Sequence, residues 1–223
     1  MAVRIDQLIR SKRKTIQITI TRDARLIVRV PLKLSLKWIL HFVEGKSDWI
    51  EKNIASALAG NVNTPKRLFH DGEKILYLGS TYGLSVVKDE SAISIRDDRL
   101  LFPKELMINP EAFLEKWYVN EARTYIGTRL TSLSSAMNAP YKSFRITRAR
   151  RRWGSCSSKN TLNFAWRLVQ AEPRVIDYVI VHELCHIFVK NHSKAFWQMV
   201  EKNIPDYRII RKWLRDHQEL MVL

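Results

Sequence analysis

The chain has 223 residues, of which 46% are hydrophobic, and it carries a formal net charge of +16. This is enough apolar material for a folded core, and the length suits one domain of two lobes or two small domains. Its two cysteines, Cys156 and Cys185, form no CxxC pair, which excludes a disulfide framework and a zinc site of four cysteines.

No signal peptide is recognisable at the start of the chain, because no apolar segment follows its basic residues. No uninterrupted apolar run approaches the roughly 18 residues of a membrane helix. We therefore expect a cytoplasmic protein that does not enter a membrane.

Short runs of alternating apolar and polar residues dominate the first third of the chain, as in half-buried strands. Residues 15–20 and 26–30 flank a turn at residues 22–24 and therefore predict a hairpin. The further elements, in chain order, are a helix capped by Ser35 that ends at residue 43, a helix over 47–58, a loop over 61–66, and strands at 74–78, 82–87, 92–95 and 100–102.

Residues 103–110 are the best predicted domain boundary. A cap, a proline and an acid at Asn109, Pro110 and Glu111 start a helix that is predicted to run to about residue 137. The elements that follow are a strand at 143–150, a loop over 153–160, a strand at 161–168, and helices over 174–189, 193–203 and 206–217.

Residues 182–186 read His-Glu-Leu-Cys-His, an HExxH motif within an apolar helix. Residues four apart lie about 40° apart around a helix axis, so His182 and His186 project from one face within reach of one metal ion. Glu183 lies near the same rim and can act as general base, which is the zincin arrangement. Metal coordination would compensate the cost of burying these groups, whereas a chance HExxH on an exposed helix is the alternative.

We therefore predict one Zn²⁺ per chain and a metal-activated water that attacks a peptide carbonyl, with Glu183 as general base and later as general acid. A catalytic zinc ion needs three protein ligands and one open position. His192 is the first candidate for the third ligand, because a turn after the helix can bring it beside the other two. A surface histidine without a role is the alternative, and Glu201 on the next predicted helix is the rival ligand. Cys185 is expected to be a small buried residue.

Basic side chains gather before the predicted loop, with no acid between Lys142 and Arg152. This segment is a candidate for the edge strand that aligns a substrate backbone by strand addition; a solvated basic strand is the alternative. Asp177 and Asp206 are candidate acceptors for imidazole N–H groups, and Asp206 is also a candidate helix cap. The candidates for substrate or transition-state contacts, among which the sequence does not choose, are Arg151, Arg152, Tyr178 and Tyr207.

Several stretches make the chain resemble the YgjP-like metallopeptidases, a group related to SprT-like and WLM-type zincins. They span nearly the whole chain, and residues 151–197 are the most specific. In the related groups the histidine of a motif like NHSKAFW is the third zinc ligand, which supports His192. One departure is Ala24, where a glycine is expected. The stretches are RSKRKTIQITI near the start, WIEKN at 49–53, YLGSTYGLSV at 77–86, RRWGSCSSKNTLNFAWRL at 151–168, VIDYVIVHELCHIFVKNHSKAFW at 175–197 and PDYRIIRKWL at 205–214.

The resemblance implies a β-rich N-terminal part and a compact α+β zincin domain that acts on protein or peptide substrates. We therefore expect an α+β fold with a β-rich N-terminal lobe and helical insert over residues 1–105, and a zincin-like catalytic domain with the HExxH helix over 106–223. Two alternatives involve nucleic acid, because the surface is strongly basic. One is an SprT-type protease that acts on DNA-bound proteins, and the other is a non-catalytic module with structural zinc.

Overall fold

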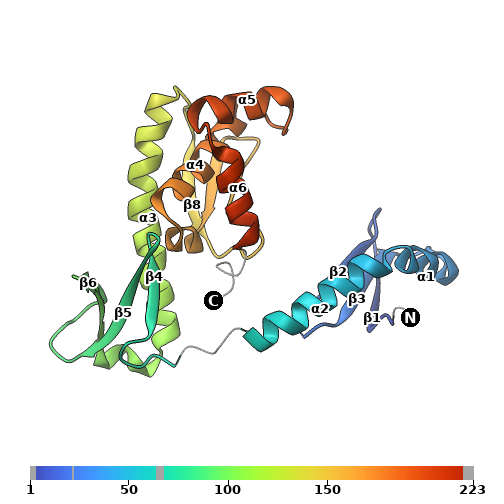
Figure 1. Cartoon of the computed structure of the whole chain (residues 1–223). Helices are drawn as coiled ribbons and strands as arrows, with labels where there is room; N and C mark the ends of the chain where they lie inside the picture. Colours follow the sequence, from blue (N-terminus) through green and yellow to red (C-terminus); the bar gives the residue numbers. More distant parts are fainter. Residues whose placement is uncertain (1–3, 22, 64–67, 218–223) are drawn as a thin grey trace. The chain divides into compact units, whose positions relative to one another are not determined.

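The computed structural model describes residues 4–21, 23–63 and 68–217. It divides into two compact units, Met1–Lys66 and Arg67–Leu223. Both units combine helices with a β-sheet (Figure 1), which confirms the predicted α+β class. Among the described residues, no helix is long and apolar enough to cross a membrane.

The first unit is a three-stranded sheet with two helices. Its strand order is β1(Gln7–Ser11), β3(Leu26–Pro31), β2(Gln17–Ile20), and β2 pairs antiparallel with β3 as the predicted hairpin. β1, which pairs parallel with β3, was not predicted, because none of its residues is buried. The helices are α1(Leu36–Glu44), capped by the Ser35 side chain, and α2(Ser47–Asn63), which covers the first three residues of the predicted loop; the rest of that loop lies outside the described residues. The core consists of Leu26, Val28, Val30, Ile39, Val43 and Ile50.

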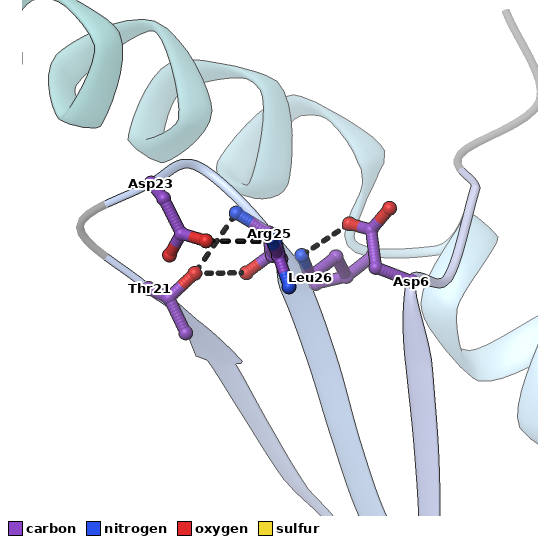
Figure 2. Close-up of polar contacts among 5 residues, drawn as sticks. All are labelled: Asp6, Thr21, Asp23, Arg25 and Leu26. Carbon is purple, nitrogen blue, oxygen red and sulfur yellow. Dashed lines mark hydrogen bonds and ion pairs between the residues drawn. The ribbon is translucent and has the colours of Figure 1, made fainter.

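Side-chain hydrogen bonds close the turn of the hairpin (Figure 2). Thr21 Oγ1 accepts from the Arg25 amide at 2.9 Å and donates to the Arg25 carbonyl at 3.1 Å, while Arg25 Nε pairs with Asp23 at 2.7 Å. Asp6 Oδ2 accepts from the Leu26 amide at 2.6 Å, which ties the start of β1 to β3. Ala24 has a φ of +58°, in the left-handed region that favours glycine.

Replacement of Ala24 by glycine should therefore stabilise this hairpin, by about 1 kcal/mol, because glycine adopts the left-handed conformation without strain from a Cβ atom. Hydrogen exchange of the β2 and β3 amides would measure the change. The matched control is Ala55→Gly on the exposed side of α2, where the helical backbone gives glycine no advantage and the substitution should destabilise. Faster exchange in Ala24→Gly would contradict the expectation.

The second unit contains two sheets around one core. The four-stranded sheet has the order β4(Lys74–Tyr77), β5(Ser80–Val87), β7(Arg99–Pro103), β6(Ser94–Arg96), and the three-stranded sheet has the order β8(Ser143–Thr147), β10(Thr161–Ala165), β9(Gly154–Cys156). The helical elements are η1(Lys104–Ile108), α3(Pro110–Ala136), η2(Trp166–Gln170), α4(Pro173–Phe188), α5(Lys194–Asn203) and α6(Tyr207–Asp216).

The division between the units lies about 40 residues before the predicted boundary at 105/106. The four-stranded sheet shares its core with the C-terminal helices, since Leu84 and Phe102 belong to the same buried cluster as Leu114 and Tyr118 of α3. Tyr118 Oη also donates to the Leu76 carbonyl at 2.7 Å. The apolar face of this sheet therefore packs against helix α3 of the second unit. The two prolines at 103 and 110 suggested a domain boundary because contacts between distant residues cannot be read from the local sequence.

The three-stranded sheet brings the segment after β8 beside α4. β10 pairs parallel with β8 and antiparallel with β9, so β9 is an edge strand. α4 lies between α3 and α6 in this unit (Figure 1), and its residues Val179, Ile180 and Leu184 are buried. β9 falls within the predicted loop over 153–160, because three residues with a glycine do not give a readable strand pattern.

Candidate metal centre

Three histidines converge at the C-terminal end of α4. His182 and His186 lie one helical turn apart, and the chain leaves α4 at Val189 and turns so that His192 reaches them before α5 begins. The nearest ring nitrogens of all three lie within 4.8 Å of one another, and His192 Nε2 is 3.1 Å from His182 Nε2. His186 Nδ1 lies 3.0 Å from the Val189 carbonyl oxygen, to which it donates, so its Nε2 carries the free lone pair.

Phe196 and Trp197 of α5 support the three rings. The Phe196 ring is fully buried, with its centroid 4.9, 4.5 and 4.8 Å from those of His182, His186 and His192. Trp197 stacks on His192 at 5.5 Å. Sequence analysis missed both residues, because their contacts with the rings depend on the turn between α4 and α5.

The surroundings favour neutral imidazoles. Burial, together with the charges of His186, His192 and Arg211, lowers the pKa of His182 to about 3. The pKa of His192 is also lowered, first by burial and then by His186 and Arg211. A neutral imidazole is the form that binds a metal ion, so the site keeps its ligand nitrogens free at neutral pH.

Glu183 occupies a buried position beside this cluster. It is only 5% exposed, and its Oε2 has no hydrogen-bond partner among the described residues. Burial raises the pKa of Glu183 to about 8, and the Arg152 guanidinium opposes this shift. Gly154 of β9 packs directly against the Glu183 side chain, since a Cβ atom there would lie 2.6 Å from Glu183 Oε1 and 2.8 Å from its Cγ.

Replacement of Gly154 by alanine should therefore displace the Glu183 carboxyl. We expect a loss of activity on the order of 10²-fold, the cost of a misplaced catalytic group, with the metal affinity unchanged because the three atoms nearest to this Cβ position all belong to Glu183. Steady-state kinetics with metal analysis would measure both quantities. Gly83→Ala on β5 is the matched control, because a Cβ atom there meets nothing within 4 Å. Equal activities of the two variants would contradict the expectation.

The structure relates three of the four other sequence candidates to the histidines or to Glu183. Tyr178 is buried with its ring 5.9 Å from His182, and burial raises its pKa to about 12. Tyr207 is buried and stacks on Trp197 at 5.2 Å. Arg152 acts on Glu183 through its charge. Arg151 is exposed and forms no hydrogen bond or ion pair with this cluster in the described part of the chain.

Arg211 of α6 is a neighbour of the site that was not among the residues predicted from the sequence. Its guanidinium carbon lies 4.7 Å from the centroid of the Trp197 ring. Its charge contributes to the lowered pKa values of His182 and His192 and opposes the rise in the pKa of Tyr178 that burial causes. The i, i+4 pattern of α6 could not reveal this, because the contact depends on how α6 packs against α5 and α4.

The rival and supporting residues lie elsewhere. Glu201 points toward Arg208, with 3.9 Å between their charged atoms, and is not part of the histidine cluster. The predicted acceptor Asp177 instead binds Arg129 through both carboxylate oxygens at 2.8 and 2.7 Å, and Asp206 pairs with Arg174 and makes no cap hydrogen bond. Cys185 is buried, which raises its pKa to about 12 and disfavours a thiolate ligand.

Comparison with protein families matches residues 14–217 to the YgjP-like metallopeptidase domain. The chain belongs to this family. The match covers nearly the whole sequence and confirms the resemblance found in its motifs. A YgjP-like metallopeptidase domain implies a metal ion and a protein or peptide substrate, and the three-histidine cluster could hold such an ion.

Among solved structures, the chain is similar to the metallopeptidase zymogen of Pyrococcus abyssi abylysin. The two are 21% identical, with a TM-score of 0.38, and the alignment covers 42% of this chain and 95% of the other. A comparison with curated proteins found no match.

Proposed function

We propose that this member of the family is a zinc-dependent peptidase in which His182, His186 and His192 hold the metal and Glu183 moves the proton. The observation that carries the proposal is the meeting of three imidazoles and one buried carboxyl at the end of α4. The buried Glu183 carboxyl and the half-buried His182 ring would be costly to bury without a ligand, and membership in a metallopeptidase family supports a cation as that ligand.

The chemistry of the donor set fits zinc. Three imidazoles without a thiolate are the ligands of one class of catalytic zinc site, which keeps its fourth position open. The Val189 carbonyl fixes the His186 tautomer in the way that outer partners orient metal ligands. When bound, the ion would supply Lewis acidity to a carbonyl and a water molecule, and positive charge that favours the carboxylate form of Glu183.

Glu183 is placed for proton transfer. As a carboxylate it would take a proton from the attacking water while the new C–O bond forms, and then deliver that proton to the leaving amine while the peptide C–N bond breaks. Its buried packing against Gly154 holds the side chain at one position, and its Oε2 has no hydrogen-bond partner among the described residues. Arg152 keeps its pKa from rising further.

Two groups are suited to stabilise negative charge on the substrate oxygen. Tyr178 keeps its phenolic proton at neutral pH, because burial raises its pKa, and it lies beside His182. Arg211 brings a positive charge to the same side. We assign the oxyanion contact to these two residues rather than to Arg151, whose side chain is exposed.

The edge strand β9 gives the substrate its path. A peptide that pairs with the free edge of β9 would pass Gly154, and therefore Glu183, in the strand-addition mode of recognition. The short length of β9 limits this pairing to a few residues on each side of the scissile bond.

Metal removal tests the proposed function. Dialysis of the purified chain against a chelator should abolish cleavage of an unstructured protein such as casein, and one equivalent of zinc should restore it. Cleavage that persists in demonstrably metal-free protein would contradict the proposal.

Nucleic acid is the second candidate partner. Residues 1–66 contain 13 basic and 5 acidic side chains, a charge that favours polyanions. A protease directed to DNA-bound proteins should bind DNA in a salt-dependent manner and be stimulated by it, whereas equal proteolysis with and without DNA would exclude this function.

A further inference from the structure

The face of the β8-β10-β9 sheet that is turned away from Glu183 carries a cavity of about 330 Å³. Successive side chains of a strand point to opposite faces. A Cβ atom at Gly154 would point at Glu183, so Ser155 faces the other way, and its Oγ accepts a hydrogen bond from Asn163 Nδ2 at 3.3 Å. Both residues line the cavity, whose volume is within the range of ligand pockets.

The cavity offers donors and positive charge. Ser155 Oγ accepts from Asn163, which leaves the Ser155 hydroxyl proton to donate, and Asn163 has a second amide proton. Arg152 also lines the cavity, and it forms no ion pair with any described residue. Residues 143–165 contain six basic side chains and no acidic one, although Arg148 pairs with Glu115 of α3. A carboxylate is the group that these donors and charges fit.

A substrate on the edge of β9 would reach this cavity with every second side chain. Paired residues of adjacent strands project to the same face of a sheet, so the substrate residue opposite Gly154 would face Glu183. Its neighbour opposite Ser155 would face the cavity. Gly154 lines the cavity as well, so only the backbone of β9 separates the two environments.

We propose that the cavity lined by Arg152, Ser155 and Asn163 binds an acidic side chain of the substrate, at the residue next to the one that faces Glu183. This inference rests on the proposed peptidase function and on strand addition at β9. It assigns a preference for cleavage beside Asp or Glu to a chain whose own surface is strongly basic.

The test uses the zinc-loaded full chain and capped decapeptides of alternating Val and Thr, in which one Glu, Gln or Lys is placed at each position in turn. Mass spectrometry gives the cleavage site and the relative kcat/KM. We expect Glu to exceed Lys on the order of tenfold at one position near the scissile bond and not at its direct neighbours, the effect of one charge-assisted hydrogen bond.

Arg152→Glu should reverse the Glu-to-Lys ratio at that position. The ratio is taken within one variant, so any general effect of Arg152 on Glu183 cancels. Arg150→Glu is the matched control, because it makes the same charge change in the same segment but does not line the cavity. An unchanged ratio in Arg152→Glu, or the same shift in both variants, would overturn the proposal.

A binding measurement separates this proposal from the proposed function. Calorimetry with Glu183→Gln protein and the same peptides should give about tenfold tighter binding of the best Glu peptide than of its Lys counterpart, again dependent on Arg152. If no peptide is cleaved by the wild type but this difference is found, the cavity proposal stands and the peptidase proposal fails. Equal affinities would refute the cavity proposal whatever the outcome for cleavage.

Discussion

Replacement of Glu183 by glutamine should abolish peptide cleavage and leave the metal in place. Glutamine has the size of glutamate, so the packing against Gly154 is retained. It cannot take a proton at neutral pH, and the loss of a general base typically lowers the rate by about 10²–10⁴-fold. Assays of casein cleavage and of zinc content on the same preparation would measure both effects.

The control for this substitution is Glu201→Gln on α5. Glu201 is exposed and pairs with Arg208 at 3.9 Å, outside the histidine cluster, so the change should affect neither activity nor zinc content. If Glu183→Gln kept full activity, the carboxyl would have no catalytic role, and a structural zinc site would become the better interpretation of the three histidines.

Replacement of His192 by alanine should weaken zinc binding by more than about 100-fold, the upper end of what loss of an outer partner of a metal ligand costs. Two imidazoles on α4 would remain, and they are too few for a stable catalytic zinc site. Because His192 is exposed, its loss should leave the metal-free protein folded. Competition with a fluorescent zinc chelator would measure the affinity, and circular dichroism the fold.

Thermal unfolding gives a second measure of the same change. Zinc should raise the melting temperature of the wild type, because a ligand that binds only the folded state stabilises it, and this effect should disappear in His192→Ala. Glu201→Ala, which removes the rival ligand, should behave like the wild type. The opposite pattern, with loss in Glu201→Ala only, would transfer the third position to the glutamate.

The sequence predicted the elements whose pattern is local. The HExxH spacing within an apolar run predicted α4, and the proline and capping residues predicted the start of α3 at Pro110. His192 could be predicted as the third ligand because the short turn between α4 and α5 keeps it near the end of α4. In the structure its ring lies beside those of His182 and His186.

The residues that sequence analysis missed are those whose contacts come from distant parts of the chain. Gly154 has meaning only through the approach of β9 to Glu183, and its segment of glycine, serine and cysteine indicates a loop rather than a strand. Arg211 reaches the site because α6 packs near α4, which no periodicity on α6 reveals. The structure divides into compact units near residue 66 rather than at 105/106, and the sequence did not indicate this because shared cores are not visible in local patterns.

The most direct measurement is the zinc content and ligand set of the folded full chain, purified with ample zinc and studied by X-ray absorption at the zinc edge. We predict one zinc ion per chain, bound through imidazole nitrogens from three histidines and without a sulfur ligand. A folded protein that contains no zinc, or a zinc ion bound by the Cys185 sulfur, would contradict the account of this site.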